Sequence, residues 1–365
     1  MDLRKTLRIT AAWGVLVPSF AGAQIWGPVP ADRLEIVTGP AQTVRTKASR
    51  QAAVRLLGRV RNNYGLRNAG RGYDLKVAFN VNSGGLTEED GAWQLEEVFD
   101  PRQGLHWDAK SSAGYSITRI QANGQFFGED TGSHIPLRLA EVRAAIFDPA
   151  PSAQAVARQS IRTSSATFEG NRLQCVLLAD SPPVPGMTAG RRWDETEECI
   201  DPHSGLLRVH SQVPGRYFAY DYTNAPEIAG HMFPRKVSIY EAGKVITEIS
   251  VQSLTEIPSA DPSLFVPTSQ MLARGRATAL TGAEKIFHTA NQAALPGGGT
   301  PHVVCVFGVV TASGELAEAH SLQPSDPASQ AAVAAAQKMT FTPPPQSGAR
   351  PRQHFVFVIE SISPQ

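Results

Sequence analysis

The stretch from Gly205 to Leu254 constrains the fold of this chain most, because it holds four short alternating segments in a row. Apolar residues occupy every second position, as at Leu207 and Val209. This period of two gives a β-strand one apolar and one polar face. Pro214-Gly215 and Ala242-Gly243 lie where tight turns are required. The stretch therefore predicts an antiparallel meander with one face on a core or a cavity.

A second block of strands is predicted earlier in the chain. Alternate positions of 73–82 are apolar, and glycine-rich turns separate this segment from three further short ones. Asn123-Gly124 is a strong hairpin signal. The expected strands of this block are Tyr73 to Asn82, Trp93 to Phe99, Gly104 to Lys110 and Tyr115 to Gln121.

Helices are predicted before and between the two strand blocks. Residues 43–64 place Ala53, Leu56, Leu57, Val60 and Tyr64 on one stripe, which indicates an amphipathic helix. Further helices are expected at 133–146 and 153–161. The region from 45 to 71 has eight basic residues and no acidic one. Two interpretations stay open: contact with an anionic surface or lipid head groups, and a solvated helix face balanced by acids elsewhere.

The order of helix, strand block, helices and second strand block favours an α+β fold. Consecutive strands can pair, so we expect a curved antiparallel β half-barrel with covering helices over residues 43–267. Parallel α/β architecture is disfavoured, because strands and helices do not alternate. A linker at 268–300, with a helix at Ala283 to Ala294, precedes a small ββαβ domain at 301–362.

The N-terminus has the pattern of a signal peptide over residues 1–23. Arg4, Lys5 and Arg8 precede an apolar run, and Ala21-Gly22-Ala23 fits the cleavage rule. The alternative is a retained anchor, but the run is short for a bilayer and contains Pro18. We expect an exported, periplasmic protein with a Pro-rich segment at 24–42 and no transmembrane span in the mature chain.

Export would place the three cysteines in an oxidising compartment. Cys175 and Cys199 flank a loop rich in proline, so a disulfide between them is expected to stabilise the fold by about 3 kcal/mol. Two free thiols are the alternative. Cys305 lies among valines and is expected to be a buried strand thiol.

The first domain resembles the LolA/LolB-like lipoprotein carriers. The basic opening helix, the strand from Tyr73 to Asn82 and the run Gly91-Ala-Trp-Gln-Leu-Glu-Glu97 carry this resemblance. The run Cys199-Ile-Asp-Pro-His-Ser-Gly-Leu-Leu-Arg-Val209 and Phe233-Pro-Arg-Lys236 also contribute. The resemblance implies a concave apolar surface that holds acyl chains. An insertion at 181–190 and the two-cysteine loop depart from the pattern.

The tail resembles the C-terminal domain of TonB. The resemblance is carried by the strand at 303–311 with Ser313-Gly314 at its turn, the helix Gln330-Ala-Ala-Val-Ala-Ala-Ala-Gln337, and Phe341-Thr-Pro343 followed by Gly348. The long Pro-Lys/Pro-Glu rod of energy transducers is missing, so a partner-binding module is favoured. In the family the last strand can pair with an incoming segment. Gln353 to Ser361 is therefore the expected partner-binding edge, with Phe355, Phe357 and Ile359 on alternate positions.

Motifs for catalysis are missing from the sequence: it has no HExxH, GxSxG, CxxC or SxxK. His106 near Asp108 and Asp201 near His203 do not predict a metal site, since such pairs arise by chance. Glu96-Glu97 and the acids at 195, 197 and 198 could serve acid/base chemistry, but we interpret them as solvated strand ends. No metal, cofactor or catalytic residue is predicted.

Six aromatic residues are candidates for the lining of a ligand cavity, and core packing is an equal alternative. They are Trp93, Phe99, Trp107, Phe218, Tyr220 and Tyr222. We expect an exported, non-catalytic binding protein of the cell envelope, with a half-barrel for an apolar ligand, lipid or lipidated partner. A TonB-like interaction domain would bind an envelope protein and suggests a link to envelope transport. The alternative is a structural or adaptor protein without a cavity. The net charge of +1 predicts no nucleic-acid partner.

Overall fold

The computed structural model describes residues 37–38, 40–83, 88–132, 135–182, 190–277, 287–293, 303–310, 314–340 and 354–362. Several predictions fall outside these residues. They are the signal peptide at 1–23, most of the Pro-rich segment, most of the 181–190 insertion, and the turn at Phe341-Thr-Pro343 with Gly348. No helix among the described residues is long and apolar enough to cross a bilayer.

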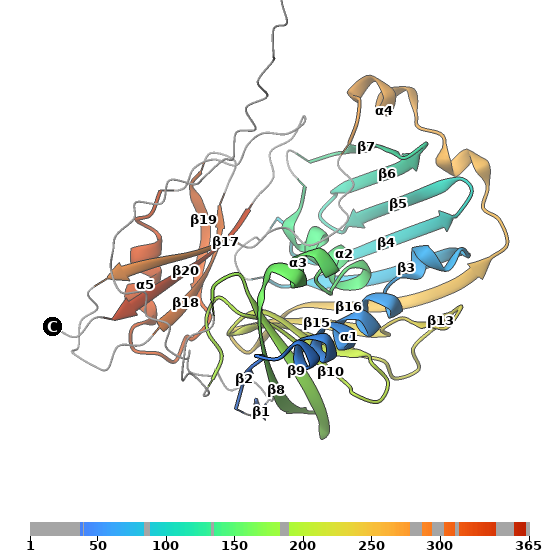
Figure 1. Ribbon diagram of the computed structural model, residues 1–365. Coiled ribbons are helices and arrows are strands. Elements are labelled where there is room, and N and C mark those ends of the chain that lie inside the picture. Colours follow the sequence, from blue (N-terminus) through green and yellow to red (C-terminus); the bar gives the residue numbers. More distant parts are fainter. Residues whose placement is uncertain are drawn as a thin grey trace, which may run out of the picture.

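A 14-stranded antiparallel sheet, called the main sheet here, forms most of the molecule (Figure 1). Its edges are β1 and β7, and β2 (Gln42–Thr43) pairs with β8 beside β1. The strands from one edge to the other are β1 (Val37–Thr38), β8 (Ser160–Phe168), β9 (Asn171–Ala179), β10 (Thr196–Ile200), β11 (Leu207–Val213), β12 (Arg216–Asp221), β15 (Lys236–Glu241), β16 (Lys244–Ile257), β3 (Gly72–Val81), β4 (Gly91–Asp100), β5 (Gly104–Ser111), β6 (Ser116–Ala122) and β7 (Gln125–Asp130). A separate small ribbon consists of β13 (Glu227–Ile228) and β14 (His231–Met232).

The predicted meander is confirmed, because β11, β12, β15 and β16 are neighbours in that order. Ala242 and Gly243 have φ values of 51° and 76°, and Asn123 and Gly124 have 50° and 73°. Two consecutive positive φ angles are what a two-residue hairpin turn with the right twist requires. The long strand β16 then pairs with β3, so that the two strand blocks form one continuous sheet.

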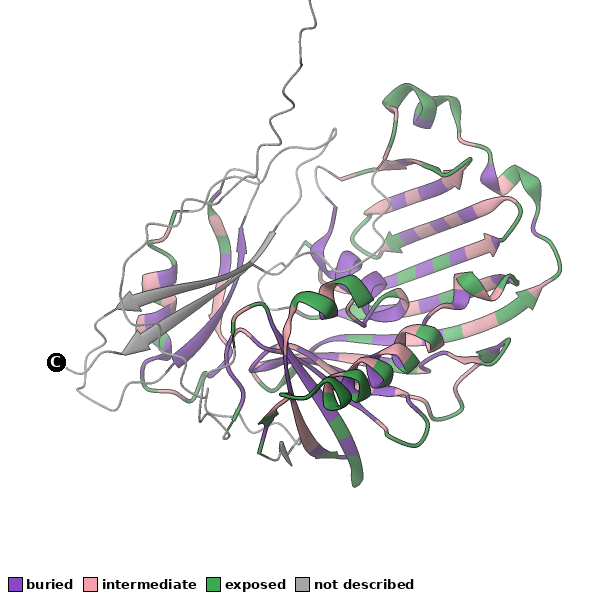
Figure 2. Ribbon diagram, in the orientation of Figure 1, coloured by how far each residue is buried: buried purple, intermediate pink, exposed green. Residues whose placement is uncertain are grey.

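Three helices lie on one side of the main sheet: α1 (Lys47–Asn63), α2 (Leu137–Phe147) and α3 (Ala153–Arg158) (Figure 1). The stripe predicted for α1 is confirmed, because Ala53, Leu56, Leu57 and Val60 are buried. Thr46 begins this helix as its N-cap, with a capping box to Ser49. Figure 2 shows the contrast with α2, whose residues are almost entirely buried, whereas the outer side of α1 is exposed.

Helix α2 fills the space that a hollow half-barrel would leave open. Its residues from Leu137 to Ile146 are all buried, and Leu139, Val142 and Ile146 belong to the main apolar core. That core also contains the inward face of the main sheet, including Tyr73, Leu75 and Trp107. The fold class is the predicted one, α+β with an open, curved antiparallel sheet covered by helices.

The other face of strands β8 to β12 carries a smaller core around the predicted disulfide. Cys175 and Cys199 are directly opposite each other in β9 and β10 and are bonded, with an S–S distance of 2.02 Å. Phe168, Leu173 and Tyr217 pack around them. Cys305 is free and buried, as predicted, and burial raises the pKa of its thiol to about 12.

A four-stranded sheet, called the C-terminal sheet here, has the order β17-β20-β18-β19. Its elements are β17 (Phe287–Ala293), β18 (Val303–Val310), β19 (Leu316–Ser321), the helix α5 (Ser329–Ala336) and β20 (His354–Ile362). The ββαβ order of 303–362 is therefore present. The helix predicted at 283–294 is wrong, because most of this segment is strand β17, which pairs in parallel with β20.

The prediction of a free edge at the last strand is also wrong. Strand β20, which holds Phe355, Phe357 and Ile359, pairs with β17 on one side and with β18 on the other. The edges of the C-terminal sheet are β17 and β19. In the predicted ββαβ order, β20 has one neighbouring strand, β18. The second neighbour, β17, comes from the segment before this domain, which was predicted to be a helix.

Apolar side chains join the C-terminal sheet to the main sheet. Leu137 of α2 and Val213 of β11 pack with Phe307, Val309 and Leu322 in one buried cluster. Gly215 has a φ of 84°, and Leu322 occupies the space that a Cβ at this position would need. The two sheets therefore share a core.

Candidate functional site

A pocket of about 440 Å³ lies where α1 and α2 both end, and we call it the mouth pocket. Arg61 and residues 64–68 form one side, and residues 147–150 and 152–153 form the other. The volume falls within the range of small-molecule sites. Its walls combine apolar groups, such as Leu66 and Phe147, with the guanidinium of Arg67.

The local sequence explains why both helices stop at this place. Tyr64 is the C-cap of α1, and Gly65 leads into the short 3₁₀ helix η1 (Leu66–Ala69). Helix α2 ends at Phe147, because Pro149 follows and cannot continue a helix. Ser152 then caps α3 by accepting a hydrogen bond from the backbone of Ala155.

A buried ion cluster lies behind the mouth pocket, and Arg67 is the member of the cluster that lines the pocket. Arg67 Nη2 lies 2.6 Å from Glu97 Oε1, and Arg143 Nη2 lies 2.9 Å from Glu97 Oε2. The hydroxyl of Tyr73 donates a further hydrogen bond to Glu97, at 2.6 Å. Burial alone would raise the pKa of Glu97, but the two guanidinium groups outweigh it and hold this pKa below its usual value. Burial and the charge of nearby Arg67 lower the pKa of Arg143 to about 10.

Aromatic rings connect this cluster to the core behind the pocket. The guanidinium carbon of Arg67 lies 4.5 Å from the ring centre of Phe147, and that of Arg143 lies 3.9 Å from the ring centre of Trp107. Such contacts favour a desolvated cation. On the other side, the hydroxyls of Tyr64 and Tyr222 are 2.7 Å apart.

The six aromatic residues singled out from the sequence all lie in the main core or against it. Trp93, Trp107, Phe218 and Tyr220 are buried, and Phe99 and Tyr222 are half-buried. Two of them are next to residues of the mouth pocket: Tyr222 bonds Tyr64, and Tyr220 meets the ring of Tyr64 edge-on at 6.3 Å.

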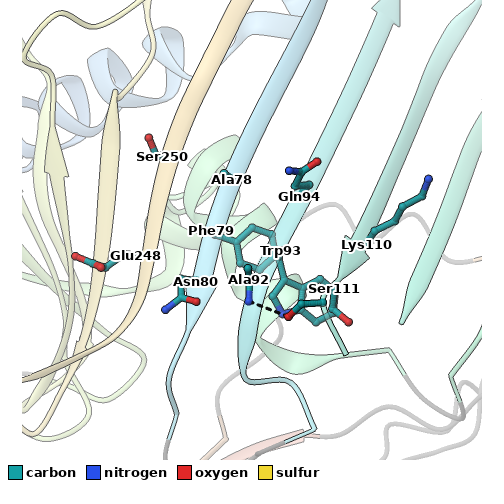
Figure 3. Close-up of a pocket in the computed structure, with 11 residues that line it drawn as sticks. Ala78, Phe79, Asn80, Ala92, Trp93, Gln94, Lys110, Ser111, Glu248 and Ser250 are labelled. Carbon is teal, nitrogen blue, oxygen red and sulfur yellow. Dashed lines mark hydrogen bonds between the residues drawn. The ribbon is translucent and has the colours of Figure 1, made fainter. Parts of the chain in front are cut away.

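A second pocket, of about 530 Å³, lies over strands β16, β3, β4 and β5. Figure 3 shows Gln94, Lys110 and Ser250 projecting from neighbouring strands into this region. Its lining combines polar side chains and the small residues Ala78 and Ala92 with two buried aromatic residues, Phe79 and Trp93, and Trp93 is one of the six aromatic candidates. The mouth pocket is the more enclosed of the two and is the better candidate site.

Buried charges also hold the two sheets together, in a group we call the interface cluster. Glu241 of β15 binds Arg138 of α2 and Arg216 of β12, at 2.9 and 2.8 Å. Glu141 pairs with the same two arginines. His320 of β19 reaches across, with Nε2 3.1 Å from Glu241 and Nδ1 3.2 Å from Glu318.

Protonated His320 balances the charges of the interface cluster. Three carboxylates, those of Glu141, Glu241 and Glu318, face two guanidinium groups, those of Arg138 and Arg216. One further positive charge makes the cluster neutral. Burial by itself lowers the pKa of His320, but the hydrogen bonds and charges of Glu241 and Glu318 raise it to about 9.

We expect the free energy of unfolding to fall at alkaline pH because of His320. Its pKa is raised in the folded state, so its contribution is complete below an unfolded value of about 6.5 and is lost as the pH rises through about 9. Allowing for partial exposure, we expect a loss of about 1–2 kcal/mol. Urea unfolding at pH 6 and pH 10 measures this loss. If the free energy of unfolding of a His320→Gln variant falls between pH 6 and pH 10 by as much as that of the wild type, the assignment to His320 is contradicted.

The acidic residues interpreted as solvated strand ends are mostly not solvated, so this interpretation is wrong except for Glu96. Glu97, Glu195, Glu197 and Glu198 are buried. Each faces a cation or a histidine, such as Arg162 for Glu195 and His210 for Glu198. The alternation of the strands does not reveal these buried acids, because the arginine or histidine that pairs with each of them lies elsewhere in the sequence.

The other sequence candidates have ordinary structural roles. His106 is held between Asp108 and the carbonyl of Leu264, at 2.8 and 2.6 Å. Asp201 accepts the backbone N–H groups of His203 and Ser204, which makes a turn. Within the described residues, the one set of three possible metal ligands is Cys175, Glu197 and Cys199, in which the disulfide occupies both sulfurs.

Three of the five basic residues of α1 donate hydrogen bonds to backbone carbonyls of neighbouring segments, whereas Lys47 and Arg55 are exposed, as a solvated helix face predicts. Arg50 donates to the carbonyls of Val156, Ala157 and Gln159, which end helix α3. Arg59 and Arg61 donate to carbonyls of the 202–203 turn and of Pro151. These arginines therefore tie α1 to neighbouring loops.

Comparisons with known proteins show similarity of fold at low sequence identity. No family model and no curated protein matches the sequence. A DUF1329 family protein from Desulfovibrio piger has 8% identity and a TM-score of 0.37, covering 60% of this chain and 98% of that one. A LolA superfamily protein from Nitrosomonas europaea has 9% identity and a TM-score of 0.33, covering 59% and 97%. The MucA/MucB complex from Pseudomonas aeruginosa has 12% identity and a TM-score of 0.26, covering 58% and 60%.

Proposed function

We propose that this chain is a non-catalytic binding protein of the cell envelope, whose mouth pocket takes an apolar ligand or the lipid of a lipidated partner. The observation that carries the proposal is the half-open pocket of about 440 Å³ at the helix ends, whose lining combines apolar groups with polar and charged ones, and the aromatic core behind it. Small-molecule sites combine an apolar lining with placed polar groups that orient the ligand.

The aromatic core supports the proposal as a place into which a ligand could extend. The indole nitrogen of Trp107 and the hydroxyl of Tyr220 are buried and have no hydrogen-bond partner within the described residues. Buried polar atoms normally have partners. Tyr220 meets the ring of Tyr64, which lines the pocket, at 6.3 Å, so this part of the core lies next to the pocket.

The location in the envelope rests on two observations. Residues 1–23 have the pattern of a signal peptide, and the chain carries a buried disulfide, which is typical of exported proteins. The C-terminal sheet is proposed as a TonB-like interaction module. Its edge strands β17 and β19, rather than β20, would be the strands to which a partner could add.

Blocking the mouth pocket tests the proposal. Ala153 lines the pocket and is exposed, so Ala153→Trp should fill it without disturbing the core. We expect this variant to bind a fluorescent acyl probe at least about tenfold more weakly than the wild type, by fluorescence titration. Ala157→Trp, on the exposed side of the same helix α3 and outside the pocket, is the matched control. Failure of the wild type to bind any apolar probe would contradict the proposal.

A structural or adaptor role is the second candidate, and one observation favours it. Helix α2 fills the concave side of the main sheet, so that the interior is packed. In that case the chain would bind partners through strand edges alone. Native mass spectrometry of protein purified without detergent separates the two candidates, because co-purified lipid is expected under the first.

A further inference from the structure

We infer that the mouth pocket recognises a single-chain amphiphile with an anionic head group, and that Arg67 is the cation that receives this head. The inference rests on the proposed function and adds the chemical class of the ligand. A fatty acid and an alkyl phosphate share this chemistry.

Neighbouring side chains hold the guanidinium of Arg67 in place. Its Nε and Nη2 bond Glu97 and Tyr73, at 3.2, 2.6 and 3.2 Å, which fixes the plane of the guanidinium. Its Nη1 makes no hydrogen bond to any described residue, and its side chain is 26% exposed within the lining of the pocket. An arginine held in this way offers N–H donors in a fixed direction, which suits a carboxylate or phosphate.

The charged groups in and behind the pocket do not cancel one another. Three guanidinium groups, those of Arg61, Arg67 and Arg143, lie in or behind the pocket. Two carboxylates, those of Glu97 and Asp148, oppose them, which leaves one positive charge in excess. An anionic ligand would cancel this excess in a partly desolvated setting, where charge pairs are strongest.

Apolar side chains lie beside the guanidinium of Arg67 in the pocket. Leu66 and Ala150 are buried wall residues, and the ring of Phe147 stacks against Arg67. A neutral oil would leave the Nη1 donors of Arg67 without a partner on binding, which carries a desolvation cost. A chain with an anionic end satisfies both parts of the pocket at once.

Competition experiments on the full-length protein test the inference. A fluorescent acyl probe is displaced with dodecanoate, dodecyl phosphate and dodecanol, which share a chain length and differ in head group. We expect each anion to bind roughly tenfold more tightly than the alcohol, in line with a charge-assisted hydrogen bond. The preference should shrink as salt is added, whereas the affinity for dodecanol should not fall.

Variants of Arg67 assign the preference to one side chain. Arg67→Gln keeps a donor for Glu97 but loses the charge, and is expected to bind dodecanoate and dodecanol equally. Arg67→Lys keeps the charge and should retain part of the preference. Arg71→Gln is the matched control, because Arg71 is exposed, pairs with Glu256 and lies outside the pocket.

The possible outcomes distinguish failure of the inference from failure of the proposed function. Equal affinity of the wild type for anions and alcohol overturns the inference and leaves the proposed function in place. Absence of any binding overturns both. Binding to phosphatidylglycerol vesicles without binding of the single-chain anions overturns the inference, because it assigns recognition to a membrane surface. The wild-type comparison decides these outcomes even if Arg67→Gln does not fold.

Discussion

Replacing Glu241 by glutamine is expected to lower the free energy of unfolding by about 3–5 kcal/mol, the range for breaking one partner of a buried ion pair. Glu241 is 2% exposed and accepts hydrogen bonds from Arg138, Arg216 and His320. The neutral amide has one acceptor oxygen, so at least one of these cations would lose its partner. The guanidinium groups hold the pKa of Glu241 well below its usual value, so the wild-type group stays ionised.

Urea denaturation at pH 7 measures this effect, and Glu248→Gln is the matched control. Glu248 lies on the adjacent strand β16 and is exposed, so its replacement is expected to change stability by no more than about 0.5 kcal/mol. Equal stability of Glu241→Gln and the control would show that the interface cluster does not hold the two sheets together. Loss of the C-terminal sheet before the main sheet would appear as a second transition.

Removing the disulfide is expected to have the next largest effect, a loss of about 3–4 kcal/mol in the double variant Cys175→Ala and Cys199→Ala. The bond joins residues 24 positions apart and closes a loop that holds a separate ion cluster. Without it, the unfolded chain gains conformational freedom, while the strand pairing of β9 and β10 remains in the folded state.

The response to a reductant distinguishes this entropic effect from damage to the core. Dithiothreitol should destabilise the wild type by a similar amount and leave the double variant unchanged. Cys305→Ser keeps the disulfide and should keep the full response, whatever its own effect on stability. A double variant as stable as the oxidised wild type would contradict the prediction.

The main sheet followed from the sequence, because its strands are specified locally. Alternation places one face of each strand on the core, and turns such as Asn123-Gly124 and Ala242-Gly243 fix pairing between consecutive strands. Helix α1, the disulfide and the buried thiol of Cys305 were predicted for similar reasons. Each depends on neighbours in the chain or on a residue type with few possible environments.

The candidate site was visible only in part. The aromatic residues behind the mouth pocket were singled out, but Arg67 and Glu97 were not joined, because they lie 30 positions apart. Arg138, Glu141 and Arg143 interrupt an otherwise apolar helix, and these three residues are the signal in the sequence that α2 carries buried charge. A charged side chain in the core is stable when a residue of another element pairs with it. The local sequence pattern does not show where that residue is.

By itself, the sequence determined the alternating strands, the hairpins and the amphipathic helix, since these depend on interactions within a few residues. The tertiary structure alone decided that α2 fills the concave side, that β20 is enclosed between β17 and β18, and that the acids on the strands are paired. The physical reason is that burial of a charge or pairing of an edge needs a second segment, and its position depends on how the whole chain folds.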